Sequence, residues 1–315
     1  SPPSPSPPPP LPPPPPPPSP PPPPPPAAVA VADPHLTFAH GGRADFKGEH
    51  EAWYNFLSAK NVSLNMFFVH AEFHNRHLLV HGSHMLQLAM KVRTMLTGKI
   101  FTVEYAATAS PPFKAIVRDG AGALVKAVTH GSGDWGVENL HVSMREQKHS
   151  GALGTHKDVL ALVRPALVLS TGLWQVEVVS KPFPNAPKNV GKAMLNVQIN
   201  ALYDADKDIV APHGLIGQSY DGDDFDFDGA MDDYKGKSEV TTKAMAEGAI
   251  EGKAADYRVP GKFVTDFKYT RFDAVTAQPR DTSKLTGIRR KAYKTGSAGA
   301  APDAEVDESA AIESK

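Results

Sequence analysis

The chain contains no cysteine, which excludes disulfide bonds, thiolate catalysis and thiolate metal sites. It also lacks an excess of either charge: 33 Lys and Arg residues stand against 34 Asp and Glu residues, for a formal net charge of −1 at pH 7. A protein that binds nucleic acid or an anionic membrane through its overall charge needs a basic surplus. We therefore expect no nucleic-acid partner.

Long apolar runs are missing as well. No stretch approaches the roughly 20 apolar residues of a membrane-spanning helix, so we expect no membrane span. Signatures of catalysis are also missing: there is no Gly-x-Ser-x-Gly, no His-Glu-x-x-His, no phosphate-binding loop and no dinucleotide fingerprint. We expect that the protein is not an enzyme.

Proline, by contrast, is abundant at one end of the chain. The first 26 residues contain 21 prolines, interrupted only by Ser1, Ser4, Ser6, Leu11 and Ser19. Proline fixes φ and has no amide hydrogen, so this run can neither continue a helix nor join a sheet, and it favours a polyproline II rod. At about 3.1 Å per residue the rod would reach roughly 80 Å. A linker between domains and a structural shaft are both compatible with this composition.

Composition divides the chain into a rod at 1–26, a short apolar bridge at 27–32, a globular part at 33–272 and a C-terminal extension at 273–315. The globular part is long enough to bury a substantial core. The extension is basic around 284–294 and acidic after that, so it either hangs free or lies on a neighbouring copy or on its own domain. Because the sequence begins inside the rod, we expect the chain to be processed or to be a segment of a longer protein.

Short segments with alternating or β-branched and aromatic residues indicate many strands in the globular part. The predicted strands are 62–69, 85–92, 100–105, 113–118, 123–128, 137–143, 174–180, 194–202 and 263–272. The segment 238–255 has the composition of a helix despite two interior glycines. The predicted fold is therefore mainly β, with the polyproline II rod followed by a β-sandwich or barrel that contains one helix.

Two motifs lie at opposite ends of the strand-rich region. The first is Asp33-Pro34-His35-Leu36-Thr37-Phe38, and the second is His213-Gly214-Leu215-Ile216-Gly217-Gln218, which leads into an acidic loop. Their order and character resemble the opening and closing motifs of the von Willebrand factor type D domain, over about 33–233. Ala32 and Ile216 stand where that family has glycine and cysteine. The resemblance thus implies a cysteine-free relative, in which any multimer is non-covalent.

The acidic loop places five carboxylates within eight residues, at Asp221, Asp223, Asp224, Asp226 and Asp228, with no basic residue between them. A hard cation such as Ca²⁺, which takes six to eight oxygen ligands, would relieve the repulsion between these charges. The resemblance to type D domains implies calcium in this loop, with Asp33 as a further ligand. A solvated loop without a metal ion is the alternative.

A second metal hypothesis concerns five histidines, His70, His74, His77, His81 and His84. On a helix their spacing would gather the imidazoles on one face, where they could bind zinc. The apolar residues around them favour strands, on which side chains alternate between faces. We therefore expect ordinary surface or hydrogen-bonded histidines.

Covalent modification is predicted at two places. The sequon Asn61-Val62-Ser63 is a candidate for an N-glycan. The rod resembles the hydroxyproline-rich glycoproteins of green-algal walls, which implies O-glycans on its serines and on hydroxylated prolines. The candidate prolines are Pro7, Pro8, Pro9, Pro10, Pro12, Pro13, Pro14, Pro15, Pro16, Pro17, Pro18, Pro20, Pro21, Pro22, Pro23, Pro24 and Pro25.

Together these features predict a structural extracellular glycoprotein, secreted to a cell wall, cell surface or surface filament. In it a glycosylated shaft carries domains that associate head-to-tail with copies of themselves. The alternative is a monomeric adhesion module on a stiff stalk that binds calcium or glycans. Self-association would distinguish the two.

Overall fold

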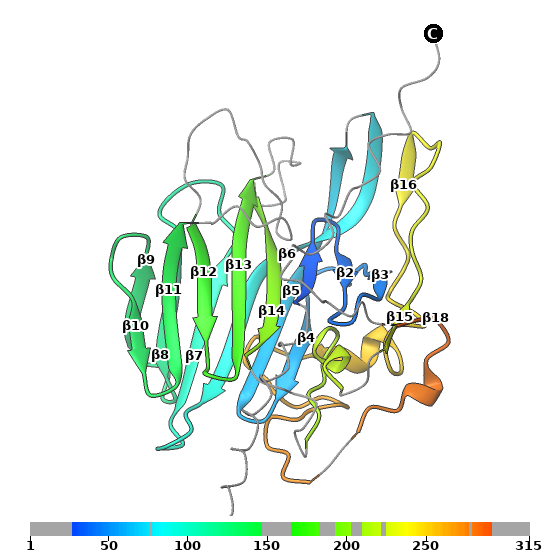
Figure 1. Cartoon of the computed structure of the whole chain (residues 1–315). Coiled ribbons are helices and arrows are strands. Elements are labelled where there is room, and N and C mark those ends of the chain that lie inside the picture. Colours follow the sequence, from blue (N-terminus) through cyan, green and yellow to red (C-terminus); the bar gives the residue numbers. More distant parts are fainter. Residues whose placement is uncertain are drawn as a thin grey trace, which may run out of the picture.

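The computed structural model describes residues 27–75, 77–146, 165–182, 193–202, 210–221, 225–276 and 279–291. The predicted rod and the end of the C-terminal extension lie outside these residues. Within them the protein is mainly β: two open, largely antiparallel sheets of eight strands each, and a separate two-stranded ribbon (Figure 1). The helical elements of this part are short 3-10 turns, η3 (Gly217–Ser219), η4 (Ala254–Tyr257) and η5 (Thr282–Lys284).

The first sheet has the strand order β10-β11-β12-β13-β14-β1-β2-β3. Its strands are β1 (Ala28–Val31), β2 (His35–Thr37), β3 (Arg43–Asp45), β10 (Trp135–Val137), β11 (Leu140–Glu146), β12 (Pro165–Ser170), β13 (Trp174–Pro182) and β14 (Ala193–Ala201). Strand β1 pairs with β14 on one side and with β2 on the other. The first described strand therefore lies inside the sheet and not at its edge.

The second sheet has the order β17-β4-β5-β6-β7-β8-β9, and β16 pairs with β6 in parallel. Its strands are β4 (Ala52–Ala59), β5 (Val62–Asn75), β6 (Leu78–Arg93), β7 (Ile100–Ala106), β8 (Lys114–Asp119), β9 (Leu124–Thr129), β16 (Glu239–Thr241) and β17 (Arg258–Val259). The long β5–β6 hairpin projects beyond the body of the sandwich (Figure 1). The ribbon pairs β15 (Phe225–Asp228) with β18 (Ile288–Lys291).

The hydrophobic core lies between the two sheets and follows from the alternation of apolar residues along their strands. In β7, Phe101, Val103 and Tyr105 are buried, whereas the residues between them are partly exposed. Because side chains of a strand point to opposite faces in turn, this alternation directs one face into the core. Trp174 of the first sheet and Tyr220, which follows η3, meet edge to face in the same core cluster, with ring centroids 5.2 Å apart.

Eight of the nine predicted strand segments overlap observed strands, and the mainly β class is confirmed. The segment 263–272 is the exception, since it forms turns and irregular backbone. Its aromatic residues favoured a strand, but its first residues are held by side-chain contacts instead: the Asn65 side chain of β5 donates to the carbonyl oxygens of Val264 and of Lys262, just before the segment, at 2.9 and 3.0 Å.

The predicted helix at 238–255 is wrong. The segment begins as β16, continues through turns and ends in the first residues of η4. Three of its residues have positive φ, namely Ala246 at 60°, Gly248 at 87° and Gly252 at 73°. A right-handed helix cannot contain such residues, so the backbone, which the two glycines allow to turn, overrides the helix-favouring composition.

Candidate functional site

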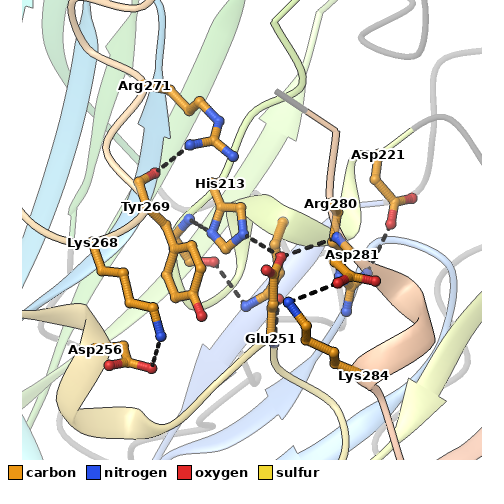
Figure 2. Close-up of polar contacts among 12 residues, drawn as sticks. His213, Asp221, Glu251, Asp256, Lys268, Tyr269, Arg271, Arg280, Asp281 and Lys284 are labelled. Atoms are coloured by element: carbon orange, nitrogen blue, oxygen red, sulfur yellow. Dashed lines mark hydrogen bonds and ion pairs between the residues drawn. The ribbon is translucent and has the colours of Figure 1, made fainter. Parts of the chain in front are cut away.

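The closing motif lies in a buried polar network, shown in Figure 2. The His213 Nδ1 accepts a hydrogen bond from the Gly214 amide at 3.0 Å, so its proton resides on Nε2. This Nε2 lies 3.2 Å from the Glu251 Oε2 and donates to it. The imidazole also stacks on Tyr269, with centroids 4.4 Å apart and planes inclined by 10°. His213 thus joins the closing motif to two segments that follow it in the chain.

Burial governs the charge of this histidine. It disfavours the imidazolium form and lowers the pKa of His213 to about 4, and the charges of Arg271 and Arg280 act in the same direction. The hydrogen bond from His213 lowers the pKa of Glu251. The pair is therefore a neutral imidazole beside an ionised carboxylate, with the imidazole fully buried, and its evident task is to hold the fold together.

The described carboxylates of the acidic loop meet arginines from the end of the chain. The Arg280 Nη1 donates to the Asp221 Oδ2 at 2.9 Å and lies 4.0 Å from the Asp226 Oδ1. Asp228 pairs with Arg290 across the β15–β18 ribbon. The charges that were predicted to bind calcium thus face cationic side chains that lie 54 to 62 residues later in the sequence.

Asp33 of the opening motif lies in a different polar environment. Its side chain is buried, its Oδ1 accepts from the Ser83 amide at 2.8 Å, and its Oδ2 finds no hydrogen-bond partner among the described residues. Burial raises the pKa of Asp33 to about 6, and the carboxylates of Asp232 and Asp45 also favour the protonated form. An unpartnered oxygen in such a position calls for an explanation, since buried polar atoms are normally satisfied.

Three further residues complete what we call the Asp33 cluster: His35, Asp45 and Asp232. The His35 Nδ1 and the Asp45 Oδ1 are 2.6 Å apart, and the Asp45 Oδ2 accepts from the Asp232 amide at 2.7 Å. Burial alone would lower the pKa of His35, but the hydrogen bond and charge of Asp45 raise it. The Tyr234 hydroxyl beside this cluster is also buried, with no partner in the described part of the chain.

The predicted calcium ligands are therefore distributed over two environments. Asp33 belongs to the Asp33 cluster, whereas Asp221, Asp226 and Asp228 face arginines. Asp223 and Asp224 lie outside the described residues. Within the described ranges no group of three or more His, Asp or Glu side chains is arranged to hold a metal ion. Calcium binding at these residues stays a prediction.

Arg280, Glu251, Asp45 and Asp232 were not predicted from the sequence. The close packing around Asp33, which was predicted as a site residue, has one possible signal in the sequence, a glycine. A Cβ atom at Gly82 would lie 2.3 Å from both carboxylate oxygens of Asp33, so no larger residue fits there. A glycine inside a strand often marks such a close approach. The sequence alone does not say which residue approaches it.

The histidines are dispersed along the β5–β6 hairpin. His70 and His74 belong to β5, His81 and His84 belong to β6, and His77 lies in the turn between them. His81 lies between two glutamates, with its Nδ1 2.9 Å from the Glu72 Oε1 and its Nε2 2.8 Å from the Glu239 Oε1. Burial lowers the pKa of His84 to about 4.

Asn61, the sequon residue, lies in the β4–β5 turn with φ of 66°. Its Oδ1 accepts from the Arg93 Nη1 at 3.2 Å, so an attached glycan would have to coexist with this contact or replace it. N-glycosylation at Asn61 stays a prediction, and the candidate prolines lie outside the described residues.

Comparison with models of known protein families finds no match for this chain, and a search of curated proteins finds none either. In the part of the chain that the structure describes, no helix combines the length and the hydropathy that crossing a membrane requires.

Proposed function

We propose that the chain is a structural subunit of an extracellular assembly, in which a β-sandwich head on a glycosylated polyproline shaft associates non-covalently with copies of itself. The observation that carries this proposal is the point where the proline-rich segment meets the head. The chain passes through Ala27 into β1, which is hydrogen-bonded to β14 on one side and β2 on the other. A force along the shaft would therefore act on a strand in the interior of an eight-stranded sheet.

Such a strand is well suited to carry load. Peeling away an edge strand breaks its hydrogen bonds one after another, whereas pulling on an interior strand loads the hydrogen-bond ladders on both of its sides. The buried network around His213 adds support, because it attaches residues after 250 to β4. The Ser58 and His213 backbones exchange hydrogen bonds at 2.6 and 2.8 Å, and the His213 Nε2 donates to Glu251. These features favour a load-bearing head over a loosely packed recognition module.

The proposal predicts both self-association and a modified shaft. For native full-length material, we expect a sedimentation coefficient that rises with protein concentration, and glycopeptide mass spectra of residues 1–32 with hydroxyl and pentose increments on prolines and serines. Removal of the glycans should leave the head folded, since its core lies between the sheets. A monomer at every concentration, together with unmodified prolines, would contradict the proposal.

The Asp33 cluster favours a second candidate, a calcium-dependent adhesion module. The unpartnered Asp33 Oδ2 lies beside the negative charges of Asp45 and Asp232, which is an environment that attracts a cation. If Ca²⁺ binds there, a concentration 100-fold above its Kd stabilises the fold by about 2.7 kcal/mol. We then expect a higher thermal midpoint in calcium than in chelator for the native sequence, but not for Asp33→Asn.

Asp273→Asn is the matched control, because Asp273 also accepts a hydrogen bond through its Oδ1, here from the Arg93 side chain, but is exposed. It should keep the calcium response of the native sequence. Equal midpoints in calcium and in chelator for the native protein would exclude this candidate. A response that persists in Asp33→Asn would place the ion elsewhere, with the acidic loop as the next position to examine.

A further inference from the structure

Exposed apolar side chains gather at one end of the sandwich. Leu96 and Met95, in the β6–β7 turn, are 86% and 54% exposed, and Leu202, just beyond β14, is 46% exposed. Together with the partly buried Leu173 of the β12–β13 turn, these residues form what we call the apolar end. Single exposed apolar residues are ordinary, but a group at one place on the surface commonly marks a contact.

Hydrogen bonds connect the turns of the apolar end and hold their backbone. The Asn139 Oδ1 accepts from the Met95 amide at 3.0 Å, and the Asn139 Nδ2 donates to the Thr171 carbonyl oxygen at 2.8 Å. The Leu202 amide donates to the Leu173 carbonyl oxygen at 2.8 Å. The β6–β7 and β12–β13 turns accordingly lie at the same, lower end of the sandwich in Figure 1.

A second clamp fixes the tip of the β6–β7 turn. The Glu138 carboxylate accepts from the Leu96 amide at 2.9 Å and from the Thr97 hydroxyl. Glu138 itself has φ of 50°, a conformation that costs energy for a residue other than glycine. The exposed leucine is thus presented on a fixed backbone, as a contact surface requires.

The proline-rich segment enters the domain at this end. In the antiparallel pair of β1 and β14, Ala28 lies opposite Ile199, so Ala27 lies level with Asn200, two residues before Leu202. The Ala28 amide donates to the buried Tyr220 hydroxyl at 3.0 Å, which fixes the point of entry. Residues 20–26, immediately before it, are seven consecutive prolines.

We propose that the apolar end is the binding surface for the proline-rich segment 1–26 of the same chain. The rings of prolines 20–26 pack there on Leu202, Leu173, Met95 and Leu96. This inference rests on the proposed function, because it makes the head and shaft one stiff unit. The chemistry is complementary: a polyproline segment offers pyrrolidine rings and no amide hydrogens, so an aliphatic surface can bind it without supplying hydrogen-bond acceptors.

The dimensions agree as well. Strands lie about 4.8 Å apart and facing sheets about 10 Å apart, so the path from β1 across β14, β13 and β12 to the β6–β7 turn measures roughly 24 Å. Seven residues of polyproline II, at about 3.1 Å each, span roughly that distance. Each residue that precedes a proline is also restricted to extended conformations, which keeps the segment from folding back as a helix.

The absence of cysteine allows a direct test on the full-length chain. Spin labels on Ser19→Cys, in the proline-rich segment, and on Ala121→Cys, in the exposed β8–β9 turn, report one distance distribution by electron spin resonance. We expect a single narrow distribution. The double substitution Leu96→Asp and Leu202→Asp should at least double its width, because it places charges under the proline rings.

The matched control is Met231→Asp, which also charges an exposed apolar side chain but lies beside Asp45, at the end of β3 away from the entry of the proline-rich segment. It should keep the distribution narrow, and circular dichroism should show all three proteins folded. A broad distribution in the labelled parent, or a narrow one that survives the double substitution, would overturn the proposal. So would a dimer that the double substitution dissociates without changing the distance, since the apolar end would then bind a second copy.

The outcome is independent of the test of the proposed function. A monomeric protein with a narrow distance distribution would refute the proposed assembly but support binding of the proline-rich segment to the apolar end. An assembly whose shaft moves freely would refute that binding alone.

Discussion

Replacing Arg280 with methionine is expected to lower the free energy of unfolding by about 3–5 kcal/mol, because it removes a buried cation from between two buried carboxylates. Arg280, Asp221 and Asp226 have side chains that are at most 4% exposed, and one guanidinium nitrogen serves both aspartates. A second nitrogen donates to the Ala249 carbonyl oxygen at 2.9 Å. Urea unfolding at pH 7, followed by circular dichroism, measures the loss.

Arg290→Met provides the matched control. Arg290 also pairs with a carboxylate of this region, Asp228, but its side chain is 58% exposed, so solvent screens the pair. Its removal should cost no more than about 1 kcal/mol. Equal losses for the two variants would show that burial does not set the strength of the Arg280 pair.

The same variants bear on the calcium prediction. If Asp221 and Asp226 can hold a metal cation, Ca²⁺ should restore part of the stability that Arg280→Met loses. In the native protein Arg280 already occupies this position, so Ca²⁺ should not raise the free energy of unfolding by binding there. A loss that calcium leaves unchanged would mean that these two aspartates serve only as partners of Arg280. Asp221→Asn in the Arg280→Met background should recover stability in either case, because it removes one of the two carboxylates that Arg280 faces in the native protein.

The predictable part of the fold is the part that local pattern determines. Segments such as 100–105 alternate between apolar and polar residues, and an antiparallel sheet with one buried face requires that alternation. The wrong predictions used composition where backbone geometry decides. In 238–255 the Ala, Glu and Lys content favoured a helix, yet the chain turns at Gly248 and Gly252.

Sequence patterns identify some residues of the candidate site but not their partners. The motifs at Asp33 and at His213 both mark buried polar positions, but the partners of these residues are set by the fold. Calcium was predicted because the acidic loop contains carboxylates and no basic residue. The cation that faces Asp221 is Arg280, which comes 59 residues later in the chain. Pairing over such a separation leaves no local pattern in a single sequence.

His213 should make the protein sensitive to acid. Its pKa is about 4 in the folded state and 6.5 ordinarily, so between these values the unfolded chain binds more protons than the folded one. Its contribution to stability is therefore complete above pH 6.5, falls as the pH drops, and stops falling below the folded pKa. The difference between the two pKa values corresponds to about 3 kcal/mol over this interval.

Other buried groups titrate in the same range, so the native curve alone does not identify the histidine. His84, whose pKa is also lowered to about 4, adds to the loss in acid. Asp33 opposes it: its raised folded pKa of about 6 contributes stability that is complete below 3.8 and lost as the pH rises through 6. The comparison between a variant and the native protein isolates one group.

In His213→Gln we expect a loss of stability at pH 7, because the stacking on Tyr269 disappears, and a weaker dependence on pH below it. The stability difference between the native protein and the variant should shrink by about 3 kcal/mol from pH 6.5 to pH 4, measured as urea unfolding free energies. His50→Gln, at an exposed ring, is the control and should run parallel to the native curve. If His213→Gln is also parallel, the imidazole does not carry the acid sensitivity, and His84 and Glu251 are the groups that remain to account for it.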